Sequence, residues 1–164
     1  KALEKRLGQV RKVDFPDYAS PSSALVKMYL NGDFRREPGD VNDYAASSFY
    51  AVDRFASFNR VWGADYRRGV PVLCDRYATS NLIYQLVKLP RKEWEGFIAW
   101  AEDFEYGRLG LPRPDRVIYL AMPVEVSQKL LAARYAEKGG KKDIHENHLA
   151  FLKACAQSAA FVAE

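Results

Sequence analysis

Apolar and polar positions along the chain follow two periods, which predict short strands separated by helices. Val70–Cys74 is a short apolar run after Gly69 and predicts a buried strand, and Val10–Phe15 predicts a short strand that Pro16 ends. Arg116–Ala121 has the same character and predicts a third strand. Apolar positions at helical spacing predict helices over 2–7, 22–31, 42–62, 80–87, 92–106, 123–136 and 148–163. This order indicates an α/β fold with a parallel sheet and crossover helices on both faces.

The stretch from Asn42 to Trp62 carries the longest helical pattern. Its recurring positions predict a largely buried face made of Tyr44, Ala45, Ser48, Phe49, Val52, Phe55, Ala56 and Trp62. Tyr50, Asp53 and Arg54 then fall on the opposite face of the same helix. We therefore expect those three side chains to lie away from the apolar core.

Length and composition indicate one globular domain. The chain has 164 residues, of which 48% are hydrophobic, enough to bury a substantial core. It contains no membrane-spanning apolar stretch and no signal peptide, so we expect a cytoplasmic protein without a membrane partner. Cys74 and Cys155 lie far apart and predict reduced, buried thiols. Both ends of the chain look cut, so we expect further residues before Lys1 and after Glu164.

The net charge of +4 indicates a phosphorylated or polyanionic partner. The basic clusters lack the interleaved aromatic residues of a strand-binding groove. We therefore expect a phosphorylated small molecule and no nucleic acid.

The most distinctive chemistry follows the second predicted strand, where Asp75, Arg76 and Tyr77 are consecutive. Open α/β sheets bind ligands at the carboxyl ends of their strands. Arg76 offers a planar set of donors suited to a phosphate, and Asp75 can hold a metal-bound water or fix the guanidinium. The alternative is a structural salt bridge at a strand end.

Polar residues in a fixed order extend this signature along the chain. They are Phe15 and Pro16, Tyr50 to Arg54, Asp75, Arg76, Tyr77, Ser80, Asn81 and Tyr84, and then Gly110 to Asp115. Over nearly its whole length the chain resembles the thymidylate kinase family of P-loop nucleoside monophosphate kinases. The resemblance implies a P-loop NTPase-like three-layer sandwich, with one kinase domain over 1–164. Related deoxynucleoside kinases have serine where this chain has Tyr77, which favours the monophosphate kinase.

The resemblance also implies roles for individual residues. Tyr50 matches the aromatic residue that stacks on thymine, and Arg54 matches the arginine that donates to the thymine O4 atom. The remaining substrate-binding residues that it implies are Phe15, Tyr18, Tyr77, Ser80, Asn81 and Tyr84, with Tyr84 against the deoxyribose. Without the resemblance, Tyr50 and Arg54 could lie on an exposed helix face, and Tyr84 could be a core tyrosine.

Tyr18 departs from the family pattern. Many members have an arginine at this position, which binds the substrate phosphate. A phenol can donate one hydrogen bond but carries no charge, so Arg76 would carry more of the electrostatic interaction.

The polar segment at about 137–147 matches the family's lid over the ATP phosphates. Its candidate cations are Arg134, Lys138, Lys141 and Lys142. On composition alone, a polar segment of this kind is more often a flexible surface loop. The phosphate-binding pattern Gly-x-x-x-x-Gly-Lys-Ser/Thr does not occur in the sequence, and in the family it precedes the first helix. We therefore expect that loop upstream of Lys1.

The resemblance implies transfer of the γ-phosphoryl group of ATP to dTMP by a homodimer. Asp75 and Arg76 would be catalytic, and Asp75 would act on Mg²⁺ through water. No general base is needed, because the acceptor phosphate is largely ionised at neutral pH. Two alternatives remain: a deoxynucleoside kinase with Asp75 as its base, and a non-catalytic nucleotide-binding module.

Overall fold

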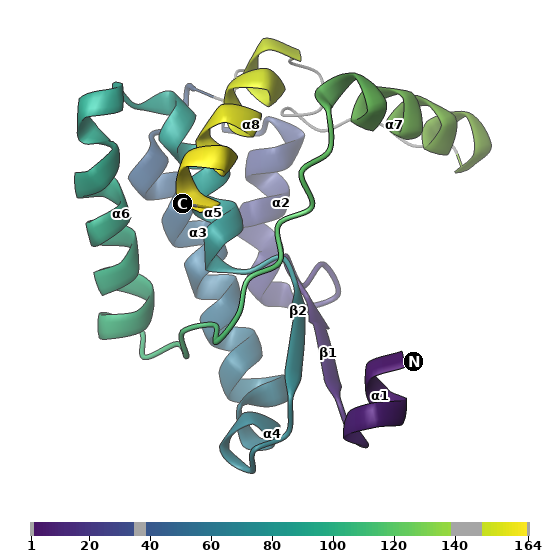
Figure 1. Cartoon of the computed structure of the whole chain (residues 1–164). Coiled ribbons are helices and arrows are strands. Elements are labelled where there is room, and N and C mark those ends of the chain that lie inside the picture. The colour runs from purple at the N-terminus through teal and green to yellow at the C-terminus, as the bar shows by residue number, and fades with distance from the viewer. Residues whose placement is uncertain (1, 35–38, 139–148, 164) are drawn as a thin grey trace.

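A computed structural model describes residues 2–34, 39–138 and 149–163 of the chain (Figure 1). Its elements are α1 (Ala2–Leu7), β1 (Arg11–Asp14), η1 (Pro21–Ser23), α2 (Ala24–Asn31), α3 (Asp43–Ser57), η2 (Phe58–Trp62), α4 (Gly63–Arg67), β2 (Val72–Asp75), α5 (Ala78–Gln85), η3 (Leu86–Lys88), η4 (Arg91–Glu93), α6 (Trp94–Glu102), η5 (Asp103–Arg108), α7 (Val124–Lys138) and α8 (Leu149–Ala163). The η elements are 3-10 helices except η2 and η5, which are π-helices.

The two strands β1 and β2 pair in parallel, which confirms two of the predicted strands and the α/β class (Figure 1). Arg11 pairs with Val72, and Asp14 pairs with Asp75. The Phe15 backbone N–H extends the ladder by donating to the Asp75 carbonyl at 3.0 Å. Because the strands are parallel, the residues that follow them come to one edge of the sheet.

The predicted strand Arg116–Ala121 is wrong for the described chain. This segment has no regular secondary structure and forms no ladder with the described residues, and its apolar side chains are exposed. Ile118 is 82% exposed and Leu120 is 80% exposed. Their apolar pattern suits a strand, but a strand also needs a neighbouring backbone for its hydrogen bonds.

The predicted inner and outer faces of α3 are also wrong. Val52 and Phe55 are 47% and 42% exposed, whereas Asp53 and Arg54 are 1% and 2% exposed. Asp53 and Arg54 can be buried because each has polar partners on neighbouring segments. The helix therefore directs its charged residues inward and leaves part of its apolar surface uncovered.

Three apolar clusters hold the sheet and helices together. One surrounds the strand ends and includes Val13, Phe15, Trp62 and Tyr77. A second joins α2 to α3, and a third joins α5 to α6. In the first cluster, the Trp62 ring packs edge-on against Phe58, with ring centroids 4.7 Å apart. Phe15 and Tyr77 thereby become fixed walls at the edge of the sheet.

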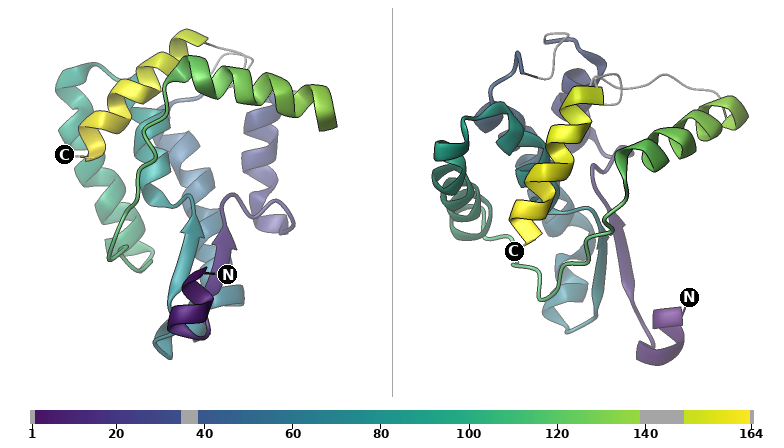
Figure 2. Two further views of the ribbon diagram at one scale, coloured as in Figure 1. Left: turned by 45° about the vertical axis from the view of Figure 1, so that its right-hand side comes forward. Right: turned by 45° about the horizontal axis from the view of Figure 1, so that its top comes forward.

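Helix α8 lies across α5, and α7 extends away from the other helices (Figure 2). The Ser158 hydroxyl donates to the Ile83 carbonyl at 2.6 Å, which ties α8 to α5. The Phe151 ring lies 6.5 Å from the Tyr84 ring. These contacts bring the start of α8 close to the residues that follow β2.

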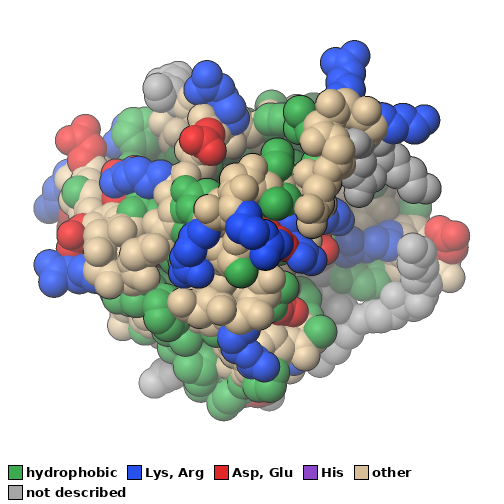
Figure 3. Space-filling view, turned by 90° about the horizontal axis from the view of Figure 1, so that it is seen from below, with side chains coloured by type: hydrophobic (Ala, Val, Ile, Leu, Met, Phe, Trp, Pro, Cys, Tyr) green, Lys and Arg blue, Asp and Glu red, His purple; other side chains and the backbone are tan. Residues whose placement is uncertain are grey.

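The surface adds two observations. None of the described helices combines the length and apolar character that a membrane span needs. On the face shown in Figure 3, Lys and Arg side chains lie in separate groups among hydrophobic ones.

Lys88 is a partly buried cation that should make stability depend on pH. Its ammonium group donates to the Tyr29 hydroxyl and to the Val41 carbonyl, both at 3.0 Å. Burial lowers the pKa of Lys88 to about 8, and the nearby Asp43 opposes that shift. An unfolded lysine keeps its proton to about pH 10.4. Between these two pKa values the unfolded chain binds more protons, so stability rises with pH.

Replacing Lys88 with methionine removes this contribution. From pH 7 to pH 10 we expect the wild type to gain about 2 kcal/mol in free energy of unfolding relative to Lys88→Met. Urea denaturation at several pH values measures the difference, and the exposed Lys92→Met serves as control. A difference that is independent of pH contradicts the prediction.

Candidate functional site

A cavity of about 340 Å³ lies where β1 and β2 end, lined by residues of α2, α3, α5, α7 and α8. Its walls include predicted site residues from across the chain, namely Phe15, Tyr18, Tyr50, Arg54, Arg76, Tyr77, Ser80, Asn81, Tyr84 and Arg134. Pro16, Leu30, Gln85 and Leu152 complete the lining. The described lining therefore carries three arginines and no carboxylate, which suits an anionic ligand.

Arg76 follows β2 directly and lines this cavity. Its backbone has φ of 64°, a left-handed conformation that side-chain-bearing residues rarely adopt. Such strain is typical of residues whose direction matters for function. The guanidinium carbon lies 5.5 Å from the centre of the Tyr84 ring. The strand end and Tyr84 together define where the cation is placed.

The Arg76 side chain stays protonated and positively charged. Desolvation lowers its pKa, but a charge interaction and hydrogen bond with Tyr84, and the nearby Tyr50 and Tyr18, raise it overall. Arg76 makes no ion pair with an acidic side chain of the described residues. It therefore presents an uncancelled positive charge in the cavity.

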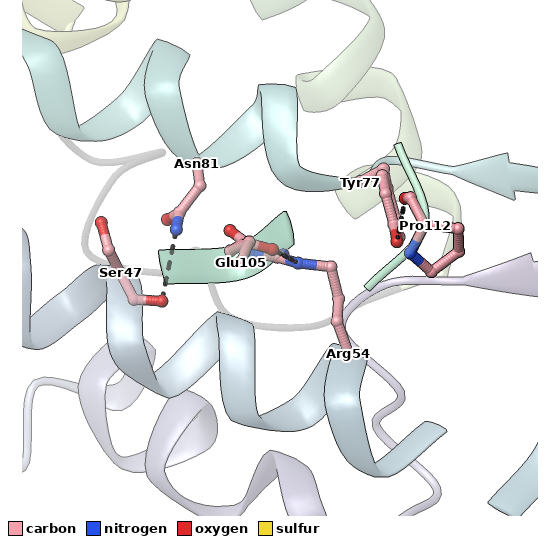
Figure 4. Close-up of polar contacts among 6 residues, drawn as sticks. All are labelled: Ser47, Arg54, Tyr77, Asn81, Glu105 and Pro112. Carbon is pink, nitrogen blue, oxygen red and sulfur yellow. Dashed lines mark hydrogen bonds and ion pairs between the residues drawn. The ribbon is translucent and has the colours of Figure 1, made fainter. Parts of the chain in front are cut away.

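Tyr77 forms part of the cavity wall and is buried. Its hydroxyl donates to the Pro112 carbonyl at 3.0 Å (Figure 4). Burial raises the pKa of Tyr77, so the phenol stays neutral and remains a donor. This hydrogen bond ties the residue after Arg76 to the connector that precedes α7.

Arg54 reaches the cavity from α3, and Glu105 on η5 holds it (Figure 4). Arg54 Nε donates to Glu105 Oε2 at 2.7 Å, and Nη2 donates to Oε1 at 2.6 Å. Both side chains are almost fully buried. The exposed-helix alternative for Arg54 is therefore wrong, and Glu105 is a partner that sequence analysis missed.

Asn81 and Gln85 lie one turn apart on α5 and line the same cavity. Asn81 Nδ2 donates to the Ser47 carbonyl at 3.2 Å, as Figure 4 shows. Asn81 Oδ1 and both polar atoms of Gln85 are buried without a hydrogen-bond partner in the described chain. Unpartnered buried polar groups are costly, so these atoms are available to a ligand or to water. Gln85 was also missed from sequence; its spacing of four from Asn81 is the signal that could have found it.

The loop after β1 is fixed by Asp53 on α3. Asp53 accepts from the Asp17 backbone N–H at 2.8 Å and from the Ser22 hydroxyl at 2.6 Å. This loop carries Phe15 and Tyr18 to the cavity. Tyr18 is 54% exposed and thus lies at the rim.

Asp75 is exposed at the end of β2 and is outside the cavity lining. Its register partner on β1 is Asp14, which pairs with Lys12 at 3.0 Å. Within the described part of the chain, no three His, Cys, Asp or Glu side chains form a metal-binding group. Lys141 and Lys142 of the predicted lid, and the Lys138 side chain, lie outside the described residues. Arg134 is the lid cation that reaches the cavity in the described chain.

Comparisons with known proteins all identify the same family. A family model described as thymidylate kinase matches residues 1–163. The chain is 30% identical to the thymidylate kinase of Mycobacterium tuberculosis over 135 residues, which cover 80% of this chain and 61% of that protein. It is 29% identical to the thymidylate kinase of Caenorhabditis elegans over 126 residues, which cover 77% of this chain and 47% of that protein.

The fold has a solved counterpart. The structure of thymidylate kinase from Candida albicans superposes with a TM-score of 0.69, at 21% identity, over 98% of this chain and 68% of that one. This match supports the P-loop NTPase-like fold. The chain spans about half to three fifths of the length of the curated relatives given above.

Proposed function

The chain belongs to the thymidylate kinase family, and from this premise we propose that it transfers the γ-phosphoryl group of ATP to dTMP. The products would be dTDP and ADP, on the route to dTTP. One observation carries the proposal: the cavity combines an uncancelled arginine, Arg76, with aromatic rings and unpartnered amides. That set matches the phosphate, ring and polar edge of a nucleotide.

The base would occupy the end of the cavity formed by α3 and α5. A pyrimidine with a 4-oxo group offers an acceptor next to a donor, which complements a side-chain amide. Gln85 and Asn81 can supply such groups, and Arg54 can donate to the 4-oxo atom. Tyr50 on α3 can stack on the ring, and Ser80 adds a hydroxyl.

The phosphate would bind at Arg76, since this cation is not cancelled by a described carboxylate. Tyr84 packs beside Arg76 and would contact the sugar between the phosphate and the base. Tyr18 at the rim can donate a hydrogen bond but adds no charge. This arrangement leaves Arg76 as the main electrostatic partner of the acceptor phosphate.

Phosphoryl transfer then depends on alignment and on neutralising charge. The acceptor phosphate has its second pKa near 6, so it needs no base from the protein. Arg134, with Lys138, Lys141 and Lys142, would contact the ATP phosphates. Mg²⁺ would neutralise phosphate charge, and Mg²⁺ sites commonly use one or two carboxylates and several waters. The exposed Asp75, with its register partner Asp14, fits that donor set.

Calorimetric binding and phosphoryl-transfer assays with dTMP, dUMP, dCMP and thymidine test the function. We expect dTMP to bind most tightly and to accept phosphate. Thymidine should bind weakly, because it lacks the group that Arg76 recognises. Phosphorylation of thymidine in preference to dTMP would favour the deoxynucleoside kinase and overturn the proposal.

Gln85→Leu should separate binding from stability. Removing an unpartnered buried amide should stabilise the fold by about 1–3 kcal/mol. Loss of its hydrogen bonds to the base should weaken dTMP binding by about tenfold. Thermal unfolding and calorimetry measure the two effects, and the exposed Gln157→Leu on α8 is the control. Unchanged dTMP affinity would place the base elsewhere.

We also propose a homodimer, supported by the uncovered apolar face of α3. Val52 and Phe55 lie three residues apart on one side of this helix, and both are exposed. Exposed apolar helix faces commonly mark interfaces between subunits. Sedimentation of Val52→Glu, compared with the wild type, tests this: we expect a monomer, and an unchanged dimer places the interface elsewhere.

A further inference from the structure

Glu105 approaches Arg54 from the side away from the nucleotide cavity. Arg54 lines that cavity, whereas Glu105 lines a second cavity of about 230 Å³ with Glu102, Tyr106 and Arg113. The η5 backbone directs Glu105 inward while its neighbours Asp103 and Arg108 stay exposed. Its carbonyl accepts from the Leu111 N–H at 3.0 Å, which fixes η5 to the following connector. Glu105 is therefore held in place independently of any ligand.

The pairing leaves a defined set of donors on Arg54. Glu105 takes Nε and one hydrogen of Nη2 in a side-on bidentate contact. Two hydrogens on Nη1 and one on Nη2 remain for other acceptors. Since both side chains are almost fully buried, little freedom is left for the guanidinium to turn.

Glu105 also cancels the charge of Arg54. Two of the three arginines that line the cavity consequently differ: Arg54 pairs with a carboxylate, and Arg76 pairs with none among the described residues. A cancelled guanidinium still donates hydrogen bonds, but it attracts an anion far less. The cavity therefore distinguishes an end that favours phosphate from an end that favours a neutral carbonyl group.

We propose that Glu105 is a positioning residue that determines base specificity, by making Arg54 a fixed, charge-cancelled donor toward the 4-oxo group of the base. This inference rests on the proposed function, because it takes the ligand to be a pyrimidine nucleotide. A 4-amino group places donors opposite the donors of Arg54 and is rejected. Without the Glu105 carboxylate, the Arg54 guanidinium is no longer held in place and its positive charge is not cancelled. Arg54 then no longer distinguishes a 4-oxo group from a 4-amino group.

The matched ligands for the test are dTMP and 5-methyl-dCMP, which carry the same methyl, sugar and phosphate groups. Calorimetry gives the ratio of their affinities for the wild type, for Glu105→Gln and for the control Asp103→Asn on the same π-helix. We expect Glu105→Gln to lower the ratio by about 10- to 100-fold, the value of one hydrogen bond to a charged group. Asp103→Asn should keep the wild-type ratio.

General damage to the fold would weaken both nucleotides alike and leave the ratio unchanged. A wild-type ratio in folded Glu105→Gln overturns the proposal. If circular dichroism shows that this variant is unfolded, the double variant with Arg54→Met and Glu105→Met carries the test, because it removes both buried charges together. A wild-type ratio in the folded double variant also overturns the proposal, because base specificity then does not depend on this pair. If the wild type itself shows no preference for dTMP, the proposed function fails, and not the positioning role alone.

Discussion

Replacing Arg76 with glycine is expected to weaken dTMP binding by at least about 100-fold, the value of two charge-assisted hydrogen bonds. The fold should hardly change. A left-handed φ costs a non-glycine residue about 1–2 kcal/mol, which glycine does not incur. Glycine in turn loses about 0.5–1 kcal/mol more backbone entropy on folding. The two effects oppose each other, so the loss of binding should not arise from unfolding.

Calorimetry with dTMP and urea denaturation measure the two quantities on the same preparation. Arg76→Lys keeps the charge without the planar set of donors, so its affinity should lie between those of wild type and Arg76→Gly. The exposed Arg60→Ala on η2, outside the cavity lining, controls for a general loss of positive charge. Wild-type affinity in Arg76→Gly would show that the phosphate binds elsewhere.

One simple rule located part of the candidate site. Arg76 comes directly after a predicted strand, and parallel pairing brings it to the same edge of the sheet as Phe15. Ser80, Asn81 and Tyr84 follow on the next helix and reach the same cavity. The resemblance to thymidylate kinases, and not a rule of sequence spacing, supplied the substrate-binding residues Phe15, Tyr18, Tyr50, Arg54, Ser80, Asn81 and Tyr84. The individual roles of these residues remain predictions.

The errors have a common cause, since each concerns a partner distant in sequence. Burial of Asp53 and Arg54 depends on Ser22 and Glu105, which no helical period reveals. The spacing of Gln85 is that of a core position. Its amide is recognised as a candidate ligand contact only because it lines the cavity without a described hydrogen-bond partner. The apolar composition of 116–121 suits a strand, but strand pairing depends on a neighbouring backbone, and none of the described residues supplies one.

The buried pair of Arg54 and Glu105 should give the largest effect on stability. Arg54→Met leaves the Glu105 carboxylate buried without its partner, and breaking a buried pair in this way costs about 3–5 kcal/mol. Replacing both residues with methionine removes the two charges together and keeps much of the volume. The double variant should therefore recover most of the lost stability, because buried ion pairs are often no more stabilising than apolar pairs.

The four proteins of this cycle separate stability from recognition. Urea denaturation of wild type, Arg54→Met, Glu105→Met and the double variant gives the coupling energy of the pair. If the double variant is stable but no longer prefers dTMP over 5-methyl-dCMP, the Arg54–Glu105 pair is needed for recognition of the base and not for stability of the fold. If instead the double variant is as unstable as the sum of the single variants, the pair is not coupled. The bidentate contact between Arg54 on α3 and Glu105 on η5 would then contribute no coupling energy to the stability of the fold.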